Sequence, residues 1–233
     1  MSPTTFVVSE SDVPARAEEG DTAAGSVTFD ASNGCERLEQ RVIQFAAGRS
    51  LPHRLERAQE VLYVVSGTGS LHLDGKEHRL APDTAVLIGS GQAYEVETSS
   101  GLKILSVRTP AREEDEPGLQ IVRFADCEER RADESRTFRV LIETDVTQFV
   151  GIVEPCRAPD HSHPYDEVGY ILEGRGFAHV GGDSIPIGPG SCFHLPPQEV
   201  HCIENTGPGV MRILGVFFPS GSPKQRAYEA SET

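Results

Sequence analysis

Apolar residues occur along this chain in short runs separated by turn residues, which is typical of β-strands. Many of these runs recur at spacings near ten residues, and Asp74-Gly75 is a hairpin signal between two of them. This pattern predicts an all-β fold of antiparallel barrels or sandwiches. The expected strands are Val42–Phe45, Val61–Val65, Ser70–Leu73, Ala85–Ile88, Tyr94–Val96, Leu102–Val107, Phe138–Ile142, Phe149–Val153, Val168–Leu172, Phe177–Val180, Ile185–Ile187, Cys192–Leu195 and Val210–Phe218.

The strand pattern is interrupted once by a charged stretch and gives way to polar sequence at both ends. One short strand, Ile121–Phe124, is expected inside the interruption, and one short helix, Lys224–Ala230, near the end. The predicted division is an N-terminal arm (1–36), a first β domain (37–108), a linker (109–137), a second β domain (138–219) and a polar tail (220–233).

The two β domains repeat each other in sequence. A constant offset of 107 residues superposes turn glycines, apolar strand positions and one glutamate over more than 40 residues. A chain with such self-similarity is predicted to be a tandem of two similar domains. The matched pairs are Glu60 with Glu167, Tyr63 with Tyr170, Gly67 with Gly174, Gly69 with Gly176, His72 with His179, Gly75 with Gly182, Pro82 with Pro189 and Tyr94 with His201.

Charge and cysteine content narrow the classes of partner. Acidic residues outnumber basic ones by 36 to 21, giving a formal charge of −15, which repels nucleic acid and anionic membranes. The five cysteines include no C-x-x-C pair, which argues against a disulfide framework and for a reducing compartment. No signal peptide or membrane-spanning run is visible. We therefore expect a cytoplasmic protein whose partner is a small molecule.

The candidate chemistry lies in the second domain, at His161-Ser162-His163. Side chains two residues apart on a strand share a face, and Glu167 keeps the same parity if the strand resumes after Pro164. His201, from another strand, would complete a set of three imidazoles and one carboxylate, which suits a divalent transition metal with open coordination positions. The alternative is that these are surface histidines in a proline-rich turn.

Two sequence motifs in the second domain resemble those of the cupin superfamily. The duplication of the domain resembles that of a bicupin, a protein with two cupin domains. The first motif is His161-x-His163, three residues, Glu167, and six residues to Gly174. The second runs from Gly190 through Pro196 and His201 to Asn205, with Gln198 where the family usually has glycine.

The resemblance implies two double-stranded β-helix (jelly-roll) barrels with a metal inside one end of the second. Its ligands would be His161, His163, Glu167 and His201, holding one divalent ion per chain: iron, manganese, nickel or zinc. In the first copy, His53 and Glu60 remain, but Leu55 and Tyr94 replace two of the histidines. That barrel is expected to have lost its metal and to supply structure, a homodimer surface or a second pocket.

Two further residues, Arg157 and Tyr165, are candidates for contact with a substrate. Arg157 shares parity with His161 and could bind a carboxylate or enolate, although a surface position is an equal alternative. Tyr165 could donate a hydrogen bond or simply pack at the rim. Glu167 is the ligand able to act as a base. His179 and His194 should point away from the pocket, because their neighbours carry the apolar parity.

The leading hypothesis is a metal-dependent enzyme acting on a small oxygen-rich molecule (a carboxylate, keto or enol compound), with a dioxygenase as the first choice. The same scaffold supports non-redox lyases, isomerases and aminohydrolases, so the fold alone does not choose among them. A non-catalytic cupin that uses its metal to bind a small molecule is the alternative from a different class.

Overall fold

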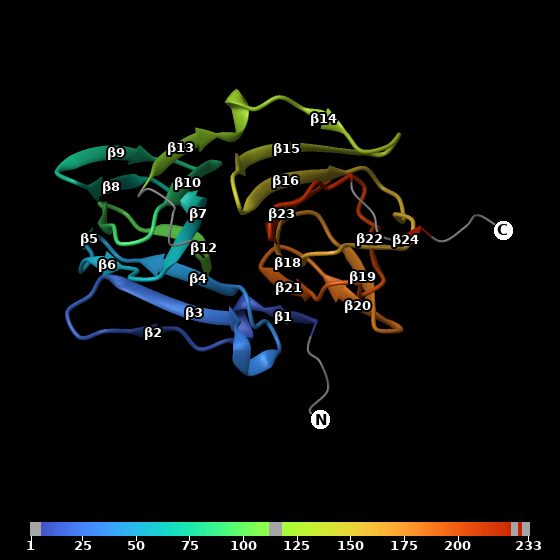
Figure 1. Cartoon of the computed structure of the whole chain (residues 1–233), viewed down its shortest axis with the longest axis horizontal. Coiled ribbons are helices and arrows are strands. Elements are labelled where there is room, and N and C mark those ends of the chain that lie inside the picture. Colours follow the sequence, from blue (N-terminus) through green and yellow to red (C-terminus); the bar gives the residue numbers. More distant parts are fainter. Residues whose placement is uncertain (1–5, 112–117, 225–227, 230–233) are drawn as a thin grey trace. The chain divides into compact units, whose positions relative to one another are not determined.

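The computed structural model describes residues 6–111, 118–224 and 228–229 of the 233-residue chain. These ranges form β-strands and three short 3-10 helices, Glu10–Asp12, Ala31–Asn33 and Phe124–Asp126 (Figure 1). None of the helices in them is long and apolar enough to cross a membrane. The chain divides into two compact units, one of residues 13–30 and 37–126 and one of residues 1–12, 31–36 and 127–233. The predicted all-β tandem is confirmed.

The N-terminal barrel consists of a seven-stranded and a five-stranded antiparallel sheet. The larger sheet has the order β13-β10-β7-β12-β4-β3-β2, and the smaller has β5-β11-β8-β9 with β6 also paired to β11. Its strands are β2 (Arg16–Ala17), β3 (Ala23–Phe29), β4 (Glu39–Phe45), β5 (Gly48–Arg49), β6 (His53–Arg54), β7 (Ala58–Gly67), β8 (Gly69–Leu73), β9 (Lys76–Leu80), β10 (Thr84–Ile88), β11 (Ala93–Thr98), β12 (Leu102–Pro110) and β13 (Leu119–Arg123).

The C-terminal barrel repeats this plan. Its larger sheet has the order β1-β21-β18-β23-β16-β15-β14, and its smaller sheet has β20-β19-β22-β17-β24. Its strands are β1 (Val7–Ser9), β14 (Arg130–Arg131), β15 (Arg136–Glu143), β16 (Thr147–Val153), β17 (His161–Ser162), β18 (Asp166–Glu173), β19 (Gly176–Val180), β20 (Asp183–Ile187), β21 (Ser191–Leu195), β22 (His201–Asn205), β23 (Met211–Phe218) and β24 (Tyr228–Glu229).

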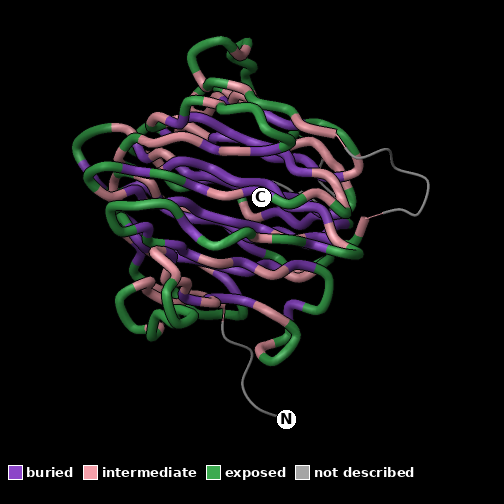
Figure 2. The backbone as a smooth tube through the Cα atoms, turned by 90° about the vertical axis from the view of Figure 1, so that its left-hand side faces the viewer, coloured by how far each residue is buried: buried purple, intermediate pink, exposed green. Residues whose placement is uncertain are grey.

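The interiors of the two barrels are filled differently. Buried residues follow the strands, and exposed residues gather at the turns (Figure 2). Inside the N-terminal barrel, the large aliphatic residues form one continuous cluster that includes Leu62, Leu71 and Ile104. In the C-terminal barrel the apolar residues fall into two clusters, one around Phe193 and Ile213 and another formed by aromatic rings.

The repeat extends to the backbone of the hairpin turns. The matched glycines Gly67 and Gly174 both have positive φ, +84° and +88°, which a residue with a side chain rarely adopts. At Gly174 an added Cβ would lie 2.7 Å from Met211 Cα, so the close approach of the strands also requires glycine. This common turn chemistry explains why the offset between the two copies is visible in the sequence.

Three predicted boundaries differ from the structure. The arm is divided, because residues 1–12 group with the C-terminal barrel, whereas residues 16–17 and 23–29 form strands of the N-terminal one. The strand expected inside the linker is β13, which pairs with β10 and so belongs to the N-terminal barrel. At Tyr228–Glu229 the predicted helix is instead strand β24, and residues 225–227 and 230 of that prediction lie outside the described residues.

Strand β1 closes the edge of the larger sheet in the C-terminal barrel. Val7 is in register with Phe193 of β21, and the amide of His194 donates to the Phe6 carbonyl at 2.9 Å. Glu10 accepts a hydrogen bond from the Tyr170 hydroxyl at 3.0 Å. In the N-terminal barrel, β13 covers the corresponding edge strand, β10. Each barrel thus protects an otherwise open edge with a segment from outside the repeated unit.

Deletion of residues 1–12 is expected to loosen β21, because its edge loses a hydrogen-bonded neighbour and its backbone groups meet water. Hydrogen exchange should accelerate at the His194 amide and leave β10, covered by β13, unchanged. Equal acceleration in both strands would contradict the assignment of β1 to the C-terminal barrel alone.

Candidate metal centre

Three histidines converge inside the C-terminal barrel from neighbouring strands of its smaller sheet. His161 on β17 is directly in register with His201 on β22, and His163, two residues on, lies on the same side. The ring centroids are 4.5 Å apart for His161 and His201, 4.9 Å for His161 and His163, and 5.2 Å for His163 and His201. One nitrogen from each ring lies within 4.8 Å of the others.

Backbone carbonyls orient two of the rings. Nδ1 of His161 lies 3.0 Å from the Pro159 carbonyl, and Nδ1 of His201 lies 2.8 Å from that of Glu199. Since a carbonyl can only accept, Nδ1 carries the proton in both rings and Nε2 keeps its lone pair. This is the tautomer that a metal-binding histidine needs, held by the outer contacts that such ligands commonly make.

The turn before His201 keeps the backbone conformation typical of glycine, although a glutamine stands at that position. Gln198 stands where the resembling motif has glycine, and its φ is +67°, in the left-handed region. Its amide donates to the His163 carbonyl at 2.7 Å, linking the turn to the strand of the other two histidines. The missing glycine therefore leaves the turn intact.

Glu167 on β18 joins the histidines from the larger sheet. Its Oε2 lies 3.4 Å from Nε2 of His163, and its side chain is buried. Burial raises the pKa of Glu167 to about 8. Burial, followed by repulsion from His201 and His163, lowers the pKa of His161 to about 3, and burial lowers that of His201 to about 4. Without a cation, every one of these three groups favours its neutral form.

These residues suit a divalent transition metal. Imidazoles that stay neutral offer nitrogen lone pairs, and a cation would favour ionisation of the desolvated Glu167 carboxyl. Three nitrogens and one oxygen form a donor set that iron, manganese, nickel and zinc accept. In the described part of the chain, no other group of three histidine, cysteine or acidic side chains is arranged to hold an ion.

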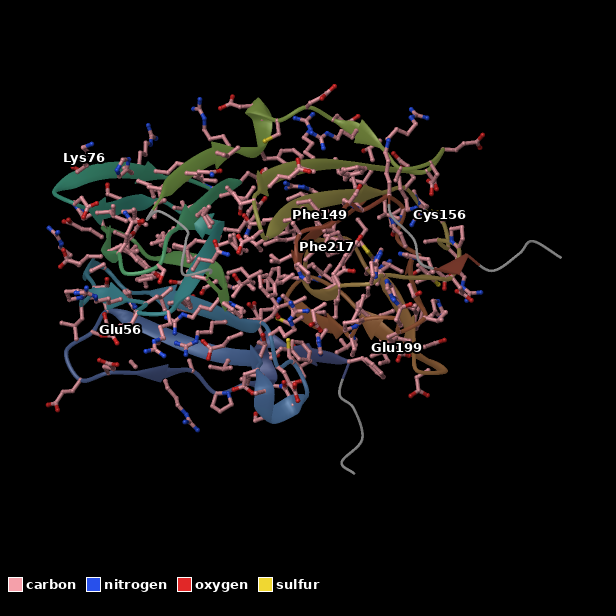
Figure 3. All side chains as sticks on the ribbon, viewed as in Figure 1. Glu56, Lys76, Phe149, Cys156, Glu199 and Phe217 are labelled. Carbon is pink, nitrogen blue, oxygen red and sulfur yellow. The ribbon has the colours of Figure 1, made fainter. Side chains whose placement is uncertain are left out.

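A cavity of about 100 Å³ opens beside the cluster. Phe149 and Phe217, whose ring centroids are 4.7 Å apart, form part of its wall (Figure 3). Gly215 leaves room for the Phe149 ring, since an added Cβ would collide with it. The polar lining consists of Arg136, Thr137, His161, His163, Glu167 and His201, and the rest is largely aromatic and aliphatic. The cavity is small and predominantly apolar, with its polar groups gathered at the histidines.

The arginine in this cavity is not the one suggested by the sequence. Arg157 is about half exposed, forms an ion pair with Asp160 at 3.1 Å and is absent from the described lining. Arg136, at the start of β15, lines the cavity instead. The sequence pattern placed the start of this strand at Phe138; extending it by two residues would have put Arg136 on the same face as Phe138.

The structure places Tyr165 behind the cluster. Its ring stacks on His163 at 5.0 Å and contacts Phe217, while its hydroxyl donates to the Ser222 carbonyl at 2.6 Å. It therefore braces His163 and fastens the segment that follows β23, and it is absent from the described lining of the cavity. Of the two roles considered for Tyr165, packing describes its position.

The other two histidines of this barrel point away from the cavity, as expected. His179 makes contacts of 2.8 Å with both Ser184 and Glu204. His194 is fully buried, with Nε2 3.2 Å from Asp166. The pair between His194 and Asp166 holds β21 to β18 next to Glu167, a role that the alternation pattern alone does not indicate.

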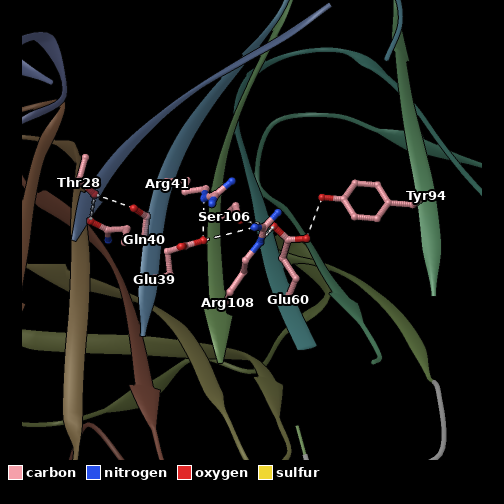
Figure 4. Close-up of polar contacts among 8 residues, drawn as sticks. All are labelled: Thr28, Glu39, Gln40, Arg41, Glu60, Tyr94, Ser106 and Arg108. Carbon is pink, nitrogen blue, oxygen red and sulfur yellow. Dashed lines mark hydrogen bonds and ion pairs between the residues drawn. The ribbon is translucent and has the colours of Figure 1, made fainter. Parts of the chain in front are cut away.

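In the N-terminal barrel, protein groups surround the carboxylate that corresponds to Glu167 (Figure 4). Glu60 is fully buried and accepts hydrogen bonds from the Tyr94 hydroxyl at 2.9 Å and from the Ser106 hydroxyl. Nε of Arg108 lies 3.3 Å from Glu60, and Nη1 of Arg108 lies 3.4 Å from Glu39. The carboxylate therefore already has a cation and two hydroxyl donors.

Strand register shows which residue lies opposite each glutamate. Arg108 is in register with Glu60 on β7, just as Phe217 is in register with Glu167 on β18. An arginine thus occupies the N-terminal position whose C-terminal counterpart is a phenylalanine. Leu55 is buried, and His53 stacks on Tyr94 at 5.3 Å. This geometry supports the expectation that the first barrel has lost its metal.

Comparison with known sequences identifies the same two segments. The family described as "Cupin domain" matches residues 41–108 and 150–217. An uncharacterised protein from Methanocaldococcus jannaschii is 35% identical over 60 residues, which are 25% of this chain and 48% of that protein. The chain therefore aligns with about half the length of that curated relative.

Solved structures resemble the whole chain at low sequence identity. A Pseudomonas aeruginosa protein, whose name refers to induction by glyoxylate, has a TM-score of 0.80 and 20% identity, covering 95% of this chain and 93% of that one. Oxalate decarboxylase of Bacillus subtilis, studied for its Mn(II) centres, has a TM-score of 0.73 and 14% identity, covering 95% and 79%. At such identities the likeness establishes the fold.

Substitution of Arg108 by methionine is expected to destabilise the N-terminal barrel by about 3 kcal/mol, because it leaves Glu60 buried without a cation. Urea unfolding measures the loss of stability, and hydrogen exchange at the amides of β7 shows whether it falls in the N-terminal barrel. The double variant Arg108→Met with Glu60→Gln should recover much of it. The surface variant Arg123→Met, which breaks an exposed pair with Asp126, should have little effect. A double variant less stable than Arg108→Met would contradict the compensation of Glu60 by Arg108.

Proposed function

The chain belongs to the cupin family, and we propose that its C-terminal barrel is the active site of a metal-dependent enzyme acting on a small oxygen-rich molecule. The proposed substrates are carboxylate, keto or enol compounds, and the proposed reaction class is that of a dioxygenase-type oxidoreductase. The N-terminal barrel is proposed to serve a structural role or to form a homodimer surface.

One observation carries this proposal: the buried cluster of His161, His163 and His201, with Glu167 beside it, opens onto a cavity. A purely structural metal site is normally closed by four protein ligands without adjoining space. Here the donor atoms border a volume large enough for a few non-hydrogen atoms of substrate. The arrangement favours an exchangeable ligand at the centre.

The residues of the chain have separable tasks. His161, His163 and His201 supply neutral nitrogen donors, two of them oriented by backbone carbonyls. A divalent ion bound there supplies Lewis acidity, and iron(II) would also exchange electrons with O₂. The aromatic and aliphatic wall keeps bulk water from the reacting atoms, which strengthens every electrostatic interaction inside.

Glu167 is the proposed proton acceptor. It is the one carboxylate among the described residues lining the cavity, and its Oε2 faces His163. Burial makes this carboxylate a stronger base, because it disfavours the charged form, whereas a bound cation acts in the opposite direction by favouring ionisation. Glu167 would take a proton on this oxygen from a bound hydroxyl or enol group.

A lyase is the second candidate reaction. It is favoured by the likeness of the whole chain to an oxalate decarboxylase, a likeness that concerns the fold. Isomerase or aminohydrolase chemistry, or non-catalytic metal-assisted binding of a small molecule, would also use a metal with open coordination positions. Manganese would accompany a lyase, iron a dioxygenase, and nickel or zinc an isomerase or aminohydrolase.

We also propose a small molecule as the partner and the cytoplasm as the location of the protein. The formal charge of −15 disfavours nucleic acid and anionic membranes, which leaves a small molecule as the partner. A cytoplasmic location is proposed from the cysteine pattern of the sequence.

Elemental analysis of the purified protein is expected to find about one divalent transition metal per chain, and almost none after His161→Ala. His179→Ala, which removes a histidine outside the cavity, should retain the metal. An oxygen electrode and CO₂ detection, applied across small carboxylates and enols, separate the two leading reactions. Substrate-dependent O₂ uptake supports the dioxygenase, and CO₂ release without O₂ uptake supports the lyase. Absence of metal from the wild-type protein would overturn the proposal.

Glu167→Gln is expected to keep the metal at reduced affinity, because three imidazoles remain, and to lower kcat by about 10²- to 10⁴-fold through loss of the base. Turnover is compared at saturating metal, with bound metal measured in the same samples. A variant that retains metal and full turnover would restrict Glu167 to the role of ligand.

A further inference from the structure

We propose that Arg136 is the carboxylate anchor of the C-terminal cavity, so that the substrate is a small molecule bearing a carboxylate and a second oxygen donor. This inference rests on the proposed function, because the second donor would lie at the metal centre. It names a specificity-determining residue that neither sequence motif contains.

Arg136 has the position and the freedom to bind an anion. Its side chain is only 14% exposed, and it lines the cavity together with Phe138, which shares its strand parity. Arg136 is the one positively charged side chain among the described residues lining the cavity.

A neighbouring carboxylate fixes the guanidinium. Nε of Arg136 donates to Oδ2 of Asp133 at 2.6 Å, and Nη2 donates to the same oxygen. Asp133 is itself held by the amide of Ser135 at 3.0 Å. In the part of the chain that the structure describes, Nη1 donates to no protein group. Asp133 thus binds one side of the planar guanidinium, while Nη1 remains available to a ligand.

The residue at the equivalent position of the N-terminal barrel indicates that Arg136 is present for function and not for folding. Arg136 is in register with Val153, and Ala23 occupies the equivalent place at the start of β3, in register with Phe45. Ala23 is buried in the continuous apolar core of the N-terminal barrel. A core position at this point of the fold therefore needs no charge. An arginine lies there in the barrel that has the histidine cluster.

Electrostatics determine the class of ligand. Three neutral imidazoles and one carboxylate leave a divalent ion with a net charge of about +1. Asp133 balances the charge of Arg136, so Arg136 acts at this small apolar cavity as a charged hydrogen-bond donor. A neutral carbonyl oxygen can also accept a hydrogen bond from Nη1, but a carboxylate accepts a stronger, charge-assisted one.

The test compares malonate with malonamide, a neutral molecule of similar size in which amides replace both carboxylates. Binding to metal-loaded protein is measured by calorimetry under nitrogen, with metal content determined in every sample. Wild-type protein should bind malonate more tightly, and Arg136→Met should weaken malonate binding by about 10- to 100-fold while changing malonamide binding little. Arg136→Lys, which keeps the charge, should recover part of the preference.

Two further variants separate the explanations. Arg139→Met, on the same strand but outside the cavity, serves as a control and should bind both probes as wild type does. Arg157→Met tests the arginine favoured by sequence parity. Loss of the malonate preference in Arg157→Met, with Arg136→Met unaffected, would overturn the assignment.

The failure of this inference and that of the proposed function give different results. Wild-type protein without metal would reject the proposed function. Protein with one metal per chain, in which Arg136→Met weakens both probes equally or neither, would reject the role of Arg136 and leave the metal site standing.

Discussion

A buried carboxylate needs a compensating cation, and both barrels are organised around that requirement. Glu60 and Glu167 occupy matching positions on β7 and β18, and both are withdrawn from water. In the N-terminal barrel the guanidinium of Arg108 supplies the positive charge, aided by hydroxyl groups. In the C-terminal barrel Phe217 stands opposite the glutamate, and three neutral imidazoles face it. Protein groups stabilise the charged carboxylate in the N-terminal copy, whereas in the C-terminal copy the Glu167 carboxyl favours its neutral form and a metal at the histidines would favour its ionisation.

The choice of cation determines how each interior is filled. A guanidinium and its hydrogen-bond partners occupy volume, so the N-terminal barrel has a continuous core that includes Tyr94. A metal ion is compact and needs open coordination positions to be useful. The C-terminal barrel accordingly keeps its aromatic rings, among them Phe149 and Phe217, at the wall of a cavity. In the N-terminal barrel the replacement of two motif histidines by Leu55 and Tyr94 therefore goes together with a filled core.

Strand periodicity and the internal repeat predicted the all-β tandem, and parity placed His161 and His163 on one face; the jelly-roll fold was implied by the resemblance to cupin motifs, which also includes His201. These features depend on local alternation and on turn glycines such as Gly174, which leave a clear trace in one sequence. The partner of Glu60 was not predicted, because Arg108 meets it only through the pairing of β12 with β7. The role of β1 was missed for the same reason: nothing in residues 7–9 indicates which edge strand they cover. Contacts that depend on how strands distant in the sequence pair cannot be predicted from the local sequence pattern.

The contrast between Arg157 and Arg136 shows where parity arguments lose force. Parity counts residues along an unbroken strand, but Pro159 interrupts the approach to His161, and Arg157 pairs with Asp160 outside the cavity. Arg136 reaches the cavity from the regular strand β15, whose alternation is intact across Arg136 and Phe138. A side chain on a continuous strand has its direction fixed by neighbours on both sides. The binding residues of this cavity are therefore best sought on the long strands of the larger sheet, with the short strands reserved for the histidines.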